Sequence, residues 1–214
     1  MKFEEIFLDV DGTIWNTTEI VARAWNRAID EVFPQVPHVT ADILKGQFGK
    51  TMYVIGNNLF LPSGRQTAAF FLKKCCQCEQ NAIEENQKNI AYKGVVATIK
   101  KLAEKLPLFI VSNCQSGYID LVMRKNGIES CIKDFTCFGE NGNTKDKNIS
   151  LIVKRNSLQK PVYVGDTQGD FEACQKVGVP FIWAAYGFGK PETENYFAKI
   201  KSFCEVEELI MEYK

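Results

Sequence analysis

Short apolar runs alternate with amphipathic segments along most of this chain. The apolar runs are bounded by turn-forming residues and several are rich in Val, Ile and Phe; they span Ile6–Val10, Leu108–Val111, Val162–Val164, Pro180–Ala184 and, more weakly, Phe135–Phe138. Strands buried on both faces have this continuous apolar character. Helical periodicity appears between them, over Gly94–Leu106, Tyr118–Asn126, Ile149–Asn156 and Asp170–Lys176. Strands that alternate with helices predict an α/β fold, a parallel sheet covered by helices on both faces.

Residues 16–90 break this alternation, because they contain helical patterns and no strand pattern. The expected helices, separated by Pro and Gly breaks such as Pro62, span Glu19–Phe33, Thr40–Phe48, Met52–Phe60 and Ser63–Gln87. In the first of them Val21, Trp25 and Ile29 share one face, as in an amphipathic helix. The pattern therefore predicts an α/β core made of residues 1–15 and 91–214, with a helical domain inserted at residues 16–90.

The composition is that of a globular protein with no net charge. Hydrophobic residues make up 45% and charged residues 24% of the 214 residues, and 26 basic residues balance 26 acidic ones. This balance argues against a nucleic-acid or anionic-membrane partner, which would need a basic face. No apolar stretch approaches the ~18 residues of a membrane span, and the first residues lack the pattern of a secretion signal. We expect a cytosolic protein with a small-molecule ligand.

The eight cysteines are expected to be reduced thiols in that compartment. Cys75, Cys76 and Cys78 form a cluster with CxxC spacing, but a zinc site would need further ligands at matching spacing. The surrounding pattern is helical, so ordinary helix packing is the simpler interpretation, with metal or redox chemistry as the alternative. The only histidine, His38, rules out multi-histidine metal sites.

Polar side chains follow several of the predicted strands, where parallel α/β sheets bind their ligands. The residues at these strand ends are Asp9, Ser112, Asn113, Asp166 and Asp170. Two carboxylates ~4 Å apart repel by ~4 kcal/mol at an effective dielectric constant of about 20, so such a cluster needs a compensating cation. Oxygen ligands without histidine indicate Mg²⁺.

Magnesium held by carboxylates suggests a phosphate ligand and a covalent mechanism. The Asp9 carboxylate could attack phosphorus and form an aspartyl phosphate. Asp11 would lie near the leaving group, where it could protonate that group and later accept a proton from the attacking water. Ser112 offers a hydroxyl to the transferred phosphoryl group, and a lysine is expected to supply positive charge.

Three motifs in order match a known family. Asp9-Val10-Asp11-Gly12-Thr13, Ser112 after an apolar strand, and Gly165-Asp166-x-x-x-Asp170 resemble the first, second and fourth motifs of the haloacid dehalogenase superfamily of phosphatases. The helical insert resembles the cap of the phosphoglycolate-phosphatase-like branch, and the resemblance covers essentially the whole chain. It implies a Rossmann-like core with an inserted α-helical cap, and a Mg²⁺-dependent phosphatase. The substrate would be a small phosphorylated metabolite: phosphoglycolate-like, a sugar phosphate or a nucleotide.

The third motif of that family is a lysine before the helix that leads to the fourth motif. Lys145 has the family's spacing to Leu151-Ile152, but Asp146 stands where many relatives have proline, so Lys147 stays an alternative. By resemblance, Mg²⁺ would be held by the Asp9 carboxylate, the Asp11 main-chain carbonyl and Asp166. Asp170 would lie close by, or would instead hold Lys145 in place.

Substrate contacts are expected from Ser112, Asn113 and Lys145, and from Lys50 in the Gly46–Lys50 loop, because similar loops in the family face the active site. The plainer interpretation of Lys50 is a solvated lysine, and that of Asp170 and Ser112-Asn113 is helix capping. Asp11 argues against a dehalogenase. The alternatives kept open are a phosphomutase of the β-phosphoglucomutase type and a non-catalytic regulatory protein of the same fold. A monomer or weak homodimer is expected.

Overall fold

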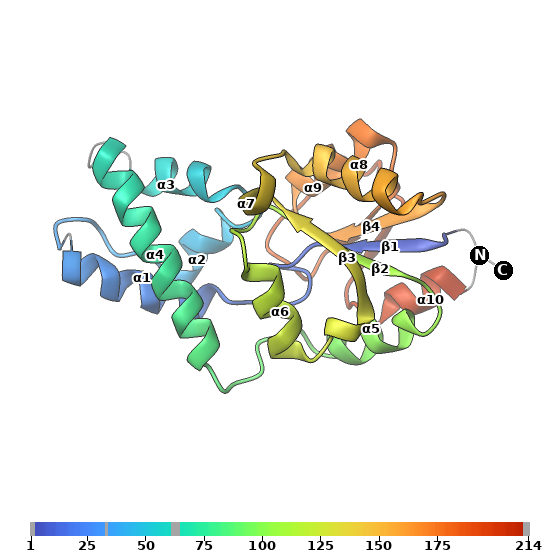
Figure 1. The fold of residues 1–214 in the computed structure, drawn as a ribbon, viewed down its shortest axis with the longest axis horizontal. Helices are drawn as coiled ribbons and strands as arrows, with labels where there is room; N and C mark the ends of the chain where they lie inside the picture. Colours follow the sequence, from blue (N-terminus) through green and yellow to red (C-terminus); the bar gives the residue numbers. More distant parts are fainter. Residues whose placement is uncertain (1–2, 33, 61–64, 212–214) are drawn as a thin grey trace.

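The computed structural model describes residues 3–32, 34–60 and 65–211 (Figure 1). Its centre is one parallel sheet with the strand order β3-β2-β1-β4-β5-β6. The strands are β1 (Glu5–Leu8), β2 (Leu108–Ser112), β3 (Ile132–Cys137), β4 (Pro161–Gly165), β5 (Phe181–Ala184) and β6 (Ala198–Ile200). The first strand lies between β2 and β4. The chain therefore adds β2 and β3 on one side of β1 and then adds β4, β5 and β6 on the other.

Helices cover both faces of this sheet (Figure 1). On one side lie α8 (Lys145–Asn156) and α9 (Gln168–Val177), with the short α7 (Phe138–Asn141) beyond the end of β3; on the other lie α5 (Val95–Ala103), α6 (Tyr118–Asn126) and α10 (Glu205–Met211). The remaining helices gather at the end of the molecule opposite the termini: α1 (Thr18–Val32), α2 (Ala41–Lys45), α3 (Met52–Phe60) and α4 (Arg65–Glu85). The predicted α/β fold class is confirmed.

Alternation of side chains along the strands divides the core into two apolar layers. Phe7, Phe109 and Tyr163 point to the α8–α9 side, with ring centroids 5.5 Å apart for Phe7–Phe109 and 6.2 Å for Phe7–Tyr163. Ile6 and Ile110 point to the other side and join the core beneath α5 and α6. Burying each of these side chains contributes about 2–3 kcal/mol, so both helical layers are held to the sheet mainly by apolar burial.

Several element boundaries differ from the sequence-based expectation. The first strand ends at Leu8 rather than Val10, because the Val10 carbonyl accepts hydrogen bonds from the amides of Thr13 and Ile14 and closes a turn. The third strand begins at Ile132, before the expected Phe135, and Phe138 already belongs to α7. Neither β6 nor α10 was expected, since β6 is only three residues long and carries no apolar run.

The inserted segment forms helices close to the expected ones. Val21, Trp25 and Ile29 of α1 are buried, as predicted. The second helix is shorter than expected: Thr40 caps it and accepts a hydrogen bond from the Ile43 amide, and it ends at Lys45 rather than Phe48. Phe33, Pro62 and Ser63, which the sequence analysis used as boundaries, lie outside the described residues. The division at residues 16–90 stays a prediction.

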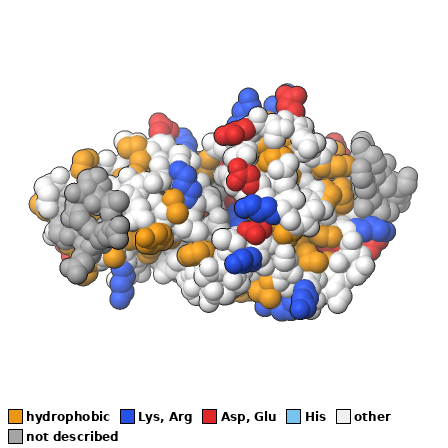
Figure 2. Space-filling view, turned by 90° about the horizontal axis from the view of Figure 1, so that it is seen from above, with side chains coloured by type: hydrophobic (Ala, Val, Ile, Leu, Met, Phe, Trp, Pro, Cys, Tyr) orange, Lys and Arg blue, Asp and Glu red, His pale blue; other side chains and the backbone are white. Residues whose placement is uncertain are grey.

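Charge is interspersed over the face shown in Figure 2, where basic and acidic side chains lie beside one another without a large area of one sign. In the ranges that the structure describes, no helix combines the length and apolar composition needed to cross a bilayer.

Candidate active site

The loop after β1 turns sharply and brings Asp9 and Asp11 to the edge of the sheet. Gly12 has φ = 85°, a left-handed conformation that glycine adopts without strain. A Cβ at this position would lie only 2.2 Å from Asp166 Oδ2. Glycine is therefore needed twice here, for the backbone conformation and for the close approach of the loop to the end of β4.

Three carboxylates from two strand ends meet at this edge. Asp9, Asp166 and Asp170 are all buried, and an oxygen of each lies within 4.8 Å of the others. Burial raises the pKa of Asp9 to about 6, although Lys145 opposes that shift. Burial and the charge of Asp170 raise the pKa of Asp166 well above its ordinary value. At both residues burial is the main cause of the raised pKa, and the nearby carboxylate of Asp170 adds to it.

Lys145 is the one cation within this cluster among the described residues. It is the first residue of α8, is buried, and its Nζ donates to Asp9 Oδ1 at 2.7 Å and also to Asp170. Burial disfavours the ammonium, but the two carboxylates outweigh this and raise the pKa of Lys145. Lys147 is exposed to solvent. The structure thus brings Lys145 to the site and leaves Lys147 outside it.

Asp170 both caps a helix and holds the lysine. Its Oδ2 accepts from the Thr167 amide at 2.9 Å and from Thr167 Oγ1 at 2.7 Å, which forms the capping box that starts α9. Its Oδ1 accepts from Lys145. Both oxygens are therefore occupied by protein donors, which is the arrangement expected of a residue that positions the lysine.

Asp166 is held by the loop that follows β5. Its Oδ2 accepts from the Phe188 amide at 2.7 Å, and its Oδ1 accepts from Thr13 Oγ1 at 3.4 Å. A Cβ on Gly187 would lie 2.3 Å from Asp166 Cβ and 2.5 Å from the Gly12 carbonyl oxygen, so this loop closes tightly over the carboxylate. The main-chain carbonyl of Asp11 takes part in none of the hydrogen bonds found among the described residues.

Asp11 is oriented by three donors that all reach the same oxygen. Oδ1 accepts from Trp15 Nε1 at 3.1 Å, Thr17 Oγ1 at 3.1 Å and Tyr118 OH at 2.9 Å. No hydrogen bond from the described residues reaches Oδ2, which leaves one oxygen available to a ligand. Burial raises the pKa of Asp11 to about 7. Asp11 was predicted from the sequence as a site residue, whereas its hydrogen bonds with Trp15, Thr17 and Tyr118 were not.

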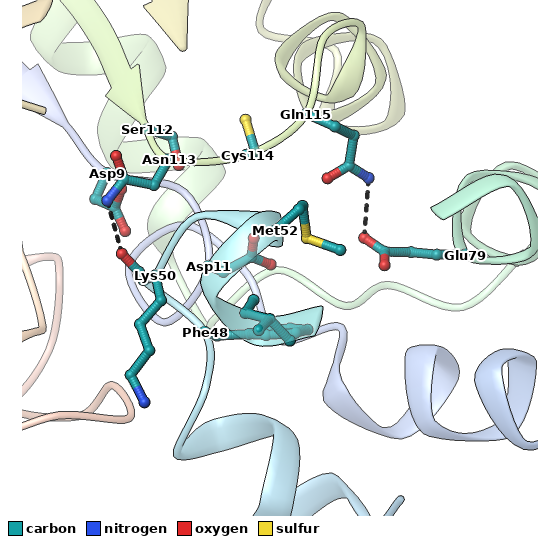
Figure 3. Close-up of a pocket in the computed structure, with 12 residues that line it drawn as sticks. Asp9, Asp11, Phe48, Lys50, Met52, Glu79, Ser112, Asn113, Cys114 and Gln115 are labelled. Carbon is teal, nitrogen blue, oxygen red and sulfur yellow. Dashed lines mark hydrogen bonds between the residues drawn. The ribbon is translucent and has the colours of Figure 1, made fainter. Parts of the chain in front are cut away.

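A pocket opens beside Asp9 and Asp11 (Figure 3). Besides the residues discussed below, it is lined by Phe48, Gly49, Met52, Ile55 and Cys114. Ser112 and Asn113 lie beside Asp9 on its wall. Asn113 Nδ2 donates to the Gly49 carbonyl at 2.8 Å and joins the loop between α2 and α3 to the sheet, whereas its buried Oδ1 has no hydrogen-bond partner.

Lys50 contributes to the pocket wall, but its amine does not point into the pocket. Nζ donates to the Gly46 carbonyl at 2.9 Å and to Gln47 Oε1 at 3.2 Å. In Figure 3 its side chain extends away from Asp9 and Asp11. Of the sequence-predicted site residues, Lys50 is the one whose functional group this structure does not bring to the others.

Glu79 is a pocket residue that the sequence analysis missed. It lies on α4, is only 3% exposed, and accepts from Trp25 Nε1 at 3.1 Å and from Gln115 Nε2 at 3.2 Å. Burial raises its pKa to about 8, and the nearby charge of Asp11 adds to this shift. A signal was present in the sequence, because Glu79 stands at helical spacing between the buried Cys75 and Ile83.

The cysteines near Glu79 pack as ordinary helix residues. Cys75 is fully buried in the core, and Cys75, Cys76 and Cys78 are free thiols within one helix. Within the described ranges, the carboxylate cluster above is the only group of three or more His, Cys, Asp or Glu side chains arranged to hold a metal.

Comparison with known proteins identifies a family and several solved structures of similar fold. The sequence model of the family described as haloacid dehalogenase-like hydrolase matches residues 6–184. No curated protein matches the chain.

The fold is similar to that of several solved structures at low sequence identity. A predicted phosphoglycolate phosphatase from Haemophilus somnus has 19% identity and a TM-score of 0.82, over 98% of this chain and 99% of that one. A predicted phosphatase from Clostridium acetobutylicum has 16% identity and a TM-score of 0.83, with the same coverage. CbbY from Rhodobacter sphaeroides, in complex with phosphate, has 16% identity and a TM-score of 0.76, over 95% and 96% of the two chains.

Replacing the buried Glu79 with Gln should change how stability depends on pH. The folded protein binds the Glu79 proton more tightly than the unfolded chain, since the folded pKa is about 8 against an ordinary 4.5. The stability that this group contributes is therefore complete below about pH 4.5 and is lost as the pH rises through 8. Glutamine does not titrate, so the Tm of Glu79→Gln minus that of the wild type should increase from pH 5 to pH 8.

Scanning calorimetry measures the Tm of both proteins at the same pH values. Subtracting one Tm from the other removes the contribution of groups that titrate identically in the two proteins. Glu85→Gln, an exposed position on the same helix, is the control and should give a constant difference. A Glu79→Gln difference that does not vary with pH would contradict the assigned burial of the carboxylate between Trp25, Gln115 and the charge of Asp11.

Proposed function

The chain belongs to the haloacid dehalogenase-like hydrolase family, and we propose that it is a Mg²⁺-dependent phosphatase acting on a small phosphorylated metabolite through an aspartyl phosphate. One observation carries the proposal. The buried Asp9 is held by Lys145 at 2.7 Å and borders the same pocket as Asp11, which keeps one oxygen free of protein donors. The proposed nucleophile and acid–base group thus line the same pocket.

The donor set at the sheet edge fits a divalent cation. Three buried carboxylates with one lysine leave uncompensated negative charge, and the Asp11 carbonyl adds a neutral oxygen ligand. Asp9, the Asp11 carbonyl and Asp166 would hold Mg²⁺, with Asp170 occupied by Lys145 and Thr167. When bound, the cation would neutralise charge on the phosphate and lower the repulsion between that phosphate and Asp9.

The first step forms a bond between an Asp9 carboxylate oxygen and phosphorus and breaks the ester bond. Lys145 would keep Asp9 oriented for this attack, and the Ser112 hydroxyl at the end of β2 would donate to a phosphoryl oxygen. Asp11 gives a proton to the departing oxygen, which leaves as an alcohol. Trp15, Thr17 and Tyr118 hold the other oxygen of Asp11, so the proton is delivered from Oδ2.

The second step returns the site to its starting state. The ionised Asp11 accepts a proton from a water molecule, and that water's oxygen attacks phosphorus. The bond between phosphorus and Asp9 breaks, inorganic phosphate is released, and Asp11 is again protonated. The hydrogen bond from Asn113 to the Gly49 carbonyl supports a closed arrangement, in which the proposed cap at residues 16–90 limits entry of water before the alcohol departs.

The relatives support a phosphomonoester substrate without identifying it. The Rhodobacter sphaeroides protein was solved with phosphate, and the Haemophilus somnus protein is described as a predicted phosphoglycolate phosphatase. A cytosolic location and a monomeric or weakly dimeric state stay predictions.

With Mg²⁺ present, the protein should hydrolyse p-nitrophenyl phosphate, and Asp9→Asn should remove this activity by at least ~10³-fold, because an amide cannot attack phosphorus. Release of p-nitrophenolate measures the rate. Chelation should stop the wild type, and added Mg²⁺ should restore it.

Circular dichroism of Asp9→Asn controls for folding. Retained turnover in a folded variant would overturn the nucleophile assignment, and no turnover of any phosphomonoester by the wild type would favour a regulatory protein of the same fold.

Asp11→Asn should slow hydrolysis of an alkyl phosphate ~10²–10⁴-fold, since an alkoxide needs a proton to depart. An aryl phosphate should lose far less, because p-nitrophenolate is stable without protonation. Steady-state kcat values for propyl phosphate and p-nitrophenyl phosphate make the comparison. Equal losses on both esters would count against Asp11 as the acid.

Lys145 and Lys147 form a matched pair on the first turn of α8. Lys145→Met should lower kcat by ~10²–10³-fold, because it removes the ammonium that compensates Asp9 and Asp170. Lys147→Met should change kcat less than ~2-fold, since that side chain is exposed. Both variants are compared by circular dichroism before assay, and a larger loss at position 147 would reverse the assignment.

A further inference from the structure

The end of the pocket away from Asp9 is formed by the buried carboxylate of Glu79. In Figure 3, Asp11 lies between Asp9 on one side and Glu79 on the other. A phosphomonoester with its phosphate at Asp9 and its ester oxygen at Asp11 would therefore extend its leaving group toward Glu79. This placement rests on the proposed function.

The described residues that line the pocket bring no cation to meet a negatively charged leaving group. The pocket is lined by the carboxylates of Asp9, Asp11 and Glu79, and its one lysine, Lys50, directs its amine to Gly46 and Gln47. Lys145 is already bound by Asp9 and Asp170 on the phosphate side. At pH values above its pKa of about 8, where Glu79 is ionised, it would repel an anionic leaving group without compensation.

The surroundings of Glu79 are suited to a positively charged group. Phe48, Met52 and Ile55 line the pocket with apolar and aromatic surface, which lowers the local dielectric and strengthens any charge interaction there. The donors Trp25 and Gln115 each reach one oxygen of Glu79 and favour its ionised form. Burial raises the pKa of Glu79, and among the described residues no cation offsets this shift.

We propose that Glu79 is a specificity-determining residue that selects phosphomonoesters whose leaving group ends in an ammonium, that is, phosphates of short amino alcohols. The ammonium would supply the positive charge that the pocket lacks and donate to a Glu79 oxygen. A glycolate leaving group, which ends in a carboxylate, would be disfavoured. The preference therefore differs from the substrate named for the similar Haemophilus somnus structure.

Three esters of nearly equal size test the charge at this end of the pocket: 2-aminoethyl phosphate, propyl phosphate and phosphoglycolate. For the wild type, kcat/KM should be at least ~10-fold higher for 2-aminoethyl phosphate than for propyl phosphate, the gain of one charge-assisted hydrogen bond. Phosphoglycolate should fall below propyl phosphate. In Glu79→Gln, which keeps the size of the side chain, both ratios should move to within ~3-fold of one.

Glu85→Gln, the same substitution at an exposed position of α4, should keep the wild-type ratios. The ratio of kcat/KM values between esters, taken within each variant, separates substrate selection from a structural role. A misplaced α4 would lower kcat/KM for all three esters together. Equal wild-type rates on the three esters, a preference that survives Glu79→Gln, or an equal loss on all three esters would each overturn the proposal.

Measuring binding in a variant that does not turn over distinguishes the selectivity of Glu79 from the proposed phosphatase activity. In Asp9→Asn, calorimetric titration should give a Kd for 2-aminoethyl phosphate at least ~10-fold lower than for propyl phosphate, and Asp9→Asn/Glu79→Gln should lose this difference. The selectivity proposal holds if this binding preference appears even where the wild type hydrolyses no ester. It fails if the enzyme turns over all esters while the binding preference is absent.

Discussion

The structure depends on one buried ion-pair arrangement at the carboxyl edge of the sheet. Lys145 lies between Asp9 and Asp170, and all three side chains are removed from solvent. Removing one member of such a group costs about 3–5 kcal/mol, because it leaves a buried charge without a partner. The fold therefore holds the proposed nucleophile in place at an energetic cost that only mutual compensation among these residues offsets.

Sheet topology makes this arrangement possible. Because β1 lies between β2 and β4, the segments after three strands reach one edge, and residues more than a hundred positions apart become neighbours. The two glycines at positions 12 and 187 then let the adjoining loops approach Asp166 more closely than any side chain would allow. Burial raises the pKa values of Asp9 and Asp166, so the packing that forms the cluster also favours a bound cation there.

The sequence predicted the parts of the site that are attached to regular elements. Breaks in the apolar runs mark the strand ends and located Asp9, Ser112 and Asp166, and the family's spacing to Leu151-Ile152 favoured Lys145. Contacts that depend on how helices pack could not be read in this way. Tyr118 reaches Asp11 only because α6 lies against the loop after β1, and β6 is too short to leave an apolar signal.

Glu79 departs from the rule that the buried face of a helix is apolar. Phe71, Cys75 and Ile83 form a buried stripe on α4, and an apolar residue at position 79 would continue that stripe without desolvating a charge. Helix propensity does not explain the carboxylate, nor does packing, since Trp25 and Gln115 donate to it without neutralising it. Departures of this kind are expected where a ligand supplies the missing partner. The cost of burying Glu79 in the unliganded protein is then the source of its selectivity, because the ligand that best relieves that cost is a cation.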